Sequence, residues 1–132
     1  MRNIPKRPVL VGLVDGKLQP CPKYRICVST QSEDDKHKID PLRYASSKKE
    51  ALDTLIKIIN SIKRTKIVKK TDDYIHAEFK TGLLKFVDDV EFLTNDEEKI
   101  IDFRSASRVG NFDWGTNRRR MEKIRKKFVS LT

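Results

Sequence analysis

The stretch Tyr74-Ile-His-Ala-Glu-Phe-Lys80 alternates strictly between two kinds of side chain. Successive side chains of a strand point to opposite faces of a sheet, so this alternation predicts a strand with one buried face. The face expected to be buried carries Ile75, Ala77 and Phe79, and the opposite face carries Tyr74, His76 and Glu78.

Three more strands are predicted around this one, at residues 66–70, 83–93 and 99–105. The short polar segments between them are typical of turns, and short turns join antiparallel strands. When the apolar side chains are required to share one face, Phe79 is expected opposite Leu84, and Val90 opposite Ile101.

Two helices are expected to flank these strands. Ser47-Lys-Lys-Glu50 has the pattern of a capping box and precedes apolar residues at helical spacing, which predicts a helix over 47–64. An apolar stripe that begins at Met121 predicts a second helix over 116–130. The expected fold is α+β: an irregular N-terminal arm, a helix, a four-stranded antiparallel meander and a C-terminal helix, with both helices on one face of the sheet.

The N-terminal arm is expected to cover residues 1–46, because four of the five prolines lie in the first 22 residues. A chain of 132 residues suits a single domain, 1–132, in which this arm precedes an α-β-β-β-β-α core at 47–130. That length is too short for two full catalytic domains or a TIM barrel.

The net charge of +10 is distributed unevenly along the chain. Residues 1–70 and 116–132 are basic, whereas residues 71–115 are acidic. A basic total suggests nucleic acid, but the same lysines are typical of solvated helix faces. No apolar run is long enough to span a bilayer, and no signal-peptide core is evident. The chain as given is therefore expected to be soluble and cytoplasmic, or exported or organellar if a leader has been removed.

The second face of the predicted sheet is rich in polar side chains. Asp89 is expected opposite or diagonal to Arg104, and such a face suits either a binding site or a solvated charge ladder. Asp88 falls on the core face, where a carboxylate needs a partner, and Arg104 or Arg108 is nearest in the pattern. We expect that pair to be structural. The polar face as a whole carries Tyr74, His76, Glu78, Lys85, Asp89, Glu91, Asp102 and Arg104.

The connection from the last strand to the second helix is the densest group of polar residues. Arginine forks and the free amides at a helix start both favour phosphate or carboxylate, so this junction suggests an anion site. An alternative is that Asp113 caps its own helix and compensates the arginines there. The candidate ligands at the junction are Arg104, Ser105, Ser107, Arg108, Asp113, Asn117 and Arg118, to which the polar sheet face would add His76, Glu78 and Asp89.

Cys21 and Cys27 leave three alternatives open. They are close enough in sequence for a disulfide in an oxidising compartment. A zinc site would need His37 and one more ligand at a spacing that matches no standard pattern, and a Cys27 nucleophile with His37 as base lacks a local activating feature. The default expectation is two structural cysteines, with no metal and no cofactor.

Several segments resemble the family known as domain of unknown function 1499. The resemblance covers about residues 18 to 128, and its most specific part is the junction motif. It implies a shared fold and marks these residues without supplying a mechanism. It also implies an exported setting, in which a Cys21–Cys27 disulfide would form. The segments are Pro20-Cys-Pro to Cys27-Val-Ser-Thr-Gln31, His37-x-Ile-x-Pro41-Leu, Tyr74-Ile-His-Ala-Glu78, Phe86-Val-Asp-Asp-Val-Glu-Phe92, and Phe103-Arg-Ser-Ala-Ser-Arg-Val-Gly110 with Asp113-x-Gly-x-Asn117-Arg.

The function expected from these residues is binding of an anionic small molecule or headgroup at the strand-to-helix junction. Enzymatic activity stays open, and the alternative is a hydrolase-like enzyme that uses His76 or His37 with Cys27 or Asp89. A second alternative is a nucleic-acid or protein interaction module that uses the helix lysines. The sequence does not indicate an oligomeric state.

Overall fold

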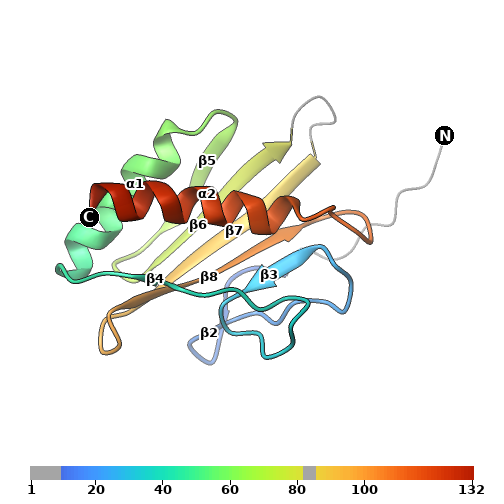
Figure 1. Ribbon diagram of the computed structural model, residues 1–132, viewed down its shortest axis with the longest axis horizontal. Helices are drawn as coiled ribbons and strands as arrows, with labels where there is room; N and C mark the ends of the chain where they lie inside the picture. Colours follow the sequence, from blue (N-terminus) through green and yellow to red (C-terminus); the bar gives the residue numbers. More distant parts are fainter. Residues whose placement is uncertain (1–9, 82–85) are drawn as a thin grey trace.

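The computed structural model describes residues 10–81 and 86–132, which form a six-stranded antiparallel sheet, a two-stranded sheet and two helices. The large sheet runs in the order β3-β8-β7-β6-β5, and β4 pairs with the free length of β8 beside β3 (Figure 1). Its strands are β3 (Cys27–Ser29), β4 (Leu42–Arg43), β5 (Thr65–Lys70), β6 (Tyr74–Thr81), β7 (Phe86–Asn95) and β8 (Ile100–Ser107).

The expected fold was wrong in its sheet and in its arm. The sheet has six strands instead of four, because the arm contributes β3 and β4 to the outer edge of β8. The arm also forms a separate hairpin of β1 (Leu13–Val14) and β2 (Lys17–Leu18). The strands β1, β2 and β4 have two residues each, which is too short to show alternation, so most of the arm was expected to be irregular.

The strand register also differs from the expectation. Phe79 lies opposite Asp88 and not Leu84, which falls outside the described residues, as does Lys85. Val90 lies opposite Ser105 and not Ile101. Both hairpins close later in the chain than expected. Because the shift is by an even number of residues, each side chain keeps its face of the sheet while its cross-strand partner changes.

Both helices pack on the apolar face of the sheet. Helix α1 (Lys48–Ser61) begins at Ser47, whose hydroxyl accepts the Glu50 amide, as the capping pattern predicted, and it ends before the expected residue 64. Helix α2 (Thr116–Leu131) crosses the sheet in Figure 1. The core between the layers includes Leu55, Ile59, Phe92, Phe103, Met121, Ile124 and Phe128.

The arm covers part of the opposite, polar face, which we had expected to be more open. The Gly12 amide donates to the Glu91 carboxylate at 2.7 Å, and a guanidinium nitrogen of Arg104 donates to the carbonyl of Pro20 at 3.3 Å. A disulfide joins Cys21 to Cys27, so the segment that lies over the sheet is linked covalently to β3. The arm therefore buries charged side chains of this face, such as Glu91 and Arg104, which need partners within the protein.

Candidate functional site

The predicted site residues separate into two networks on opposite sides of the sheet. Side chains alternate along β8, so Ser105 and Ser107 face the helices while Arg104 and Ala106 face the arm. The first network lies between the sheet and α2. The second lies between the sheet and the arm, and Arg108, just beyond β8, joins it.

Asn117 is the centre of the helix-side network. This fully buried amide accepts from the Ser105 hydroxyl at 2.7 Å and donates to the Ile26 carbonyl at 3.1 Å. It also donates to Asp113 at 2.8 Å, and Asp113 accepts the backbone amides of Gly115 and Asn117. These groups satisfy one another's hydrogen-bonding capacity. The network therefore fixes the start of α2 and leaves few free donors or acceptors for a ligand.

Asp88 belongs to the same side, as its place in the alternation indicated. Its expected partner was wrong: the carboxylate pairs with Arg120 of α2 at 2.6 Å, and not with Arg104 or Arg108. Arg120 also donates to Asn117 at 2.8 Å and lies over the ring of Phe79. Burial raises the pKa of Asp88, and the Arg120 charge opposes that rise.

Glu91 and Arg104 form the centre of the arm-side network. Glu91 is 0% exposed and lies opposite Arg104 in the register, with 3.6 Å between Oε1 and a guanidinium nitrogen. The other carboxylate oxygen accepts from the Tyr74 hydroxyl and from the Gly12 amide. Burial raises the pKa of Tyr74, and its bond to Glu91 acts in the same direction.

Asp89 connects two further residues on this face. His76 Nε2 lies 2.8 Å from Asp89 Oδ1, and Arg108 donates to both carboxylate oxygens at 2.7 and 2.8 Å. Arg108 also reaches Glu78 at 2.9 Å. Burial opposes ionisation of Asp89, but the bonds from Arg108 and His76 outweigh it and lower the pKa of the carboxyl. Asp89 lies opposite Ala106, so Arg104 is diagonal to it, which is one of the two placements expected, but the carboxylate bonds to Arg108 and not to Arg104.

A cavity of about 300 Å³ lies between the arm and this network. Two arginines and one aspartate lie at its wall, whereas the rest of the wall is mostly apolar. The charged residues are Arg104, Arg108 and Asp89, and the others are Leu10, Pro20, Cys21, Pro22, Ile26, Ala106 and Ser107.

The lowered pKa of Asp89 predicts a change in acid stability. A carboxyl whose pKa is lower in the folded state adds stability above its unfolded pKa of about 3.9, and loses it as pH falls through the folded value. We expect Asp89→Asn to be less stable at neutral pH and to lose less stability on acidification to about pH 3. Urea denaturation at several pH values measures both, and exposed Asp72→Asn is the control. A wild-type acid slope in Asp89→Asn would contradict the assignment.

The residues proposed for hydrolysis do not all come together. Cys27 is bonded to Cys21, so its sulfur is not a free nucleophile. The ring nitrogens of His37 bond to Asp34 and to the carbonyl of Tyr24, both at 2.8 Å, and not to Asp89. His76 and Asp89 remain as a pair within hydrogen-bond reach. Among the described residues, no three His, Cys, Asp or Glu side chains gather as a metal site.

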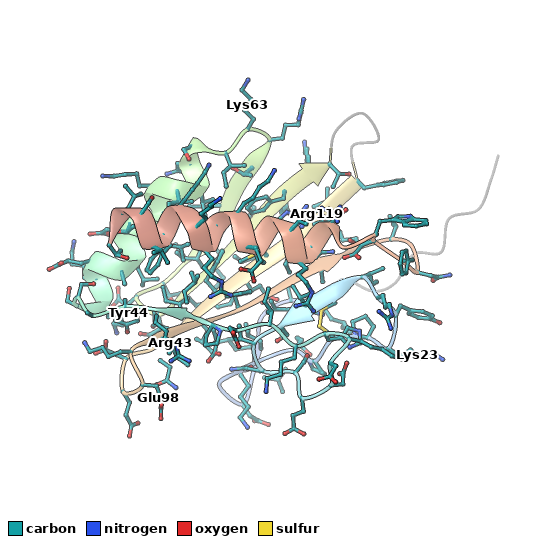
Figure 2. The ribbon with its side chains drawn as sticks, in the orientation of Figure 1. Lys23, Arg43, Tyr44, Lys63, Glu98 and Arg119 are labelled. Atoms are coloured by element: carbon teal, nitrogen blue, oxygen red, sulfur yellow. A yellow bond between two sulfur atoms is a disulfide. The ribbon has the colours of Figure 1, made fainter. Side chains whose placement is uncertain are left out.

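The helix lysines form a basic surface that is partly neutralised. Lys48 pairs with Asp73 and Lys49 with Asp53. A groove of about 510 Å³ between the helices is lined by Lys63, Arg119, Lys123 and Lys127, together with apolar residues. Figure 2 shows Arg119 near the start of α2 and Lys63 directed away from the end of α1. No helix in the described part of the chain is long and apolar enough to cross a membrane.

Three central residues were missed as candidates: Tyr74, Glu91 and Arg120. The first two were assigned to the polar face, but a face expected to be open gave no reason to single out a buried carboxylate. A signal for Arg120 was present, because Asp88 needed a buried cation and the start of α2 had an excess of arginines. Arg118 is apart from both networks and lines a small hollow with Arg25, Lys36 and Phe112.

Searches of curated proteins and of solved structures found no match. A family model described as "Protein of unknown function (DUF1499)" matches residues 17–128, which include the cavity wall from Pro20 onward and both networks except Gly12. The match confirms the resemblance carried by the Cys21–Cys27 segment and the junction motif. The chain therefore belongs to the DUF1499 family.

Proposed function

We propose that the protein binds a small molecule with one carboxylate or phosphate group and a short apolar body, in the cavity between the arm and the sheet. The observation that carries this proposal is Arg104. Its side chain is buried at the cavity wall, yet its Nε atom has no hydrogen-bond partner among the described residues. Buried polar groups are nearly always paired. The Nε atom is itself shielded from the cavity, as is the unpaired Oε1 of Glu91, so what it indicates is spare donor capacity on this guanidinium, whose one hydrogen bond in the described residues is to the Pro20 carbonyl. Spare donors on a guanidinium at the cavity wall support a ligand with an acceptor oxygen.

Arg108 supplies a second cation for the same ligand. It is about one-third exposed, and it bonds through Nε and one terminal nitrogen to Asp89 and Glu78. The two bonds to Asp89 thus fix the orientation of the Arg108 guanidinium. The two guanidinium groups at the wall suit one anionic group, and the apolar wall suits a hydrocarbon part.

The test is thermal unfolding, followed by circular dichroism, with hexanoate, hexyl phosphate and hexan-1-ol as probes. At tenfold excess over Kd a ligand raises the free energy of unfolding by about 1.4 kcal/mol. We expect this rise with one or both anions and not with the neutral alcohol. The preferred anion distinguishes a carboxylate site from a phosphate site.

Two variants locate the binding. Ala106→Leu narrows the cavity without changing its charge, and Arg108→Gln removes one cation. Each should weaken anion binding at least tenfold, when the stabilisation by ligand is measured against the same variant without ligand. Arg43→Gln, on exposed β4, is the matched control and should bind like wild type. Equal stabilisation of wild type and Ala106→Leu, or no stabilisation by either anion, would overturn the proposal.

A further inference from the structure

Two aromatic side chains stand exposed on the loop between β8 and α2. Trp114 is 79% exposed and Phe112 is 51% exposed, and their rings meet edge to face with 4.9 Å between centroids. We call this pair the aromatic tip. In Figure 1 its loop lies at the end of the molecule where β8 ends and α2 begins. Exposed apolar groups of this size mark interaction sites more often than scattered surface residues do.

The backbone holds the aromatic tip in place. Trp114 has a φ of +56°, a left-handed conformation that residues with a side chain seldom adopt. Its carbonyl accepts from Arg119 at 2.7 Å, and the Asp113 amide on its other side donates to the Arg25 carbonyl at 2.9 Å. Asp113 also accepts the Gly115 amide at 2.8 Å. The exposure of the rings is therefore fixed by a network of bonds.

Cations surround the aromatic tip. Arg25, Lys36 and Arg118 line one hollow with Phe112, and Arg119 lies against the Trp114 carbonyl. None of these four cations forms an ion pair within residues 10–81 and 86–132. The carboxylate of Asp113 is occupied by amides at the start of α2. The surface is thus apolar at its tip and positive around it.

We propose that the aromatic tip docks on an anionic lipid bilayer. Tryptophan favours the membrane interface, where its amphipathic ring sits at headgroup level, and nearby Lys and Arg attract acidic lipids. The four cations around two protruding rings complement that surface in charge. A stable protein interface needs about 800 Å² per partner around an apolar core, whereas the apolar part of this surface consists of two rings on one loop. The inference is independent of the cavity and its ligand.

The experiment uses the full chain and its own fluorescence. Trp114 is the only tryptophan in the sequence, so the emission reports the aromatic tip alone. We expect a blue shift with vesicles of phosphatidylcholine that contain phosphatidylserine, a much smaller shift with pure phosphatidylcholine, and reversal by high salt.

Cosedimentation of variants with acidic vesicles tests whether the aromatic tip makes the contact with the bilayer. Trp114→Ser and Phe112→Ser should each weaken binding at least tenfold, and Lys36→Gln and Arg118→Gln each about fivefold. Val129→Ser removes an equally exposed apolar residue from the far end of α2 and should bind like wild type. Binding that survives Trp114→Ser, or no blue shift with acidic vesicles, would overturn the proposal. The second result would favour a protein partner for the aromatic tip.

Discussion

Replacement of Arg104 by methionine is expected to lower the free energy of unfolding by about 3–5 kcal/mol. Glu91 is 0% exposed, and Arg104 is the cation across the strand from it. Methionine fills a similar space but leaves a buried carboxylate without a compensating charge. The arm also loses the bond from Arg104 to the Pro20 carbonyl. Urea denaturation at neutral pH measures the loss.

A double variant separates the charge from the packing. Arg104→Met combined with Glu91→Gln should recover part of the stability, because the isolated charge is gone while the new methionine remains. Arg43→Met, on exposed β4, should change stability by less than about 0.5 kcal/mol. If Arg104→Met costs no more than this control, the Glu91–Arg104 pair does not hold the arm side of the sheet together.

Asn117→Ala is expected to cost about 3 kcal/mol, because several buried groups lose their partner at once. The Ser105 hydroxyl, fully buried, loses its acceptor, and Arg120 loses one of its bonds beside Asp88. The Asp113 carboxylate also loses a donor. Chemical denaturation measures the change. The control is Asn60→Ala, an exposed asparagine of α1 that should cost little.

A double-mutant cycle with Ser105→Ala tests whether Asn117 acts through this network. We expect the two substitutions together to cost less than the sum of the single effects, because the second removes a group that the first had left unpaired. Additive costs would mean that the loss at Asn117 comes from the helix itself.

Alternation predicted the face of each side chain well, but it could not predict partners. An even shift in register is invisible to a pattern of period two, so Asp89 was placed on its correct face and diagonal to Arg104, whereas its bonds go to the other diagonal neighbour, Arg108. The second hairpin closes between Asn95 and Ile100, which puts Asn95 in the strand although its sequence is typical of a turn. Lys99, expected to begin a strand, has a φ of +56° and completes the turn.

The sequence predicted residues of the candidate site, but not that the sheet divides them into two separate networks. Arg104, Arg108 and Asp89 do line one cavity, whereas Ser105, Asp113 and Asn117 bond to one another behind the sheet. Apart from Asp89, the sequence places all of them within residues 104–117, and the sheet separates the two groups. The arm that closes the cavity could not be placed at all, since its pairing with β8 depends on residues far along the chain.

That long-range pairing has a consequence for the order in which the molecule can assemble. Cys27 lies opposite Ala106, and Leu42 opposite Ile101. During synthesis the first third of the chain therefore emerges long before the strand that receives it. Helix α1 and the local hairpins can form early, but β3 and β4 must wait for β8. The cavity cannot close before β8 has formed, and nascent chains that stop short of β8 leave the arm without its partner.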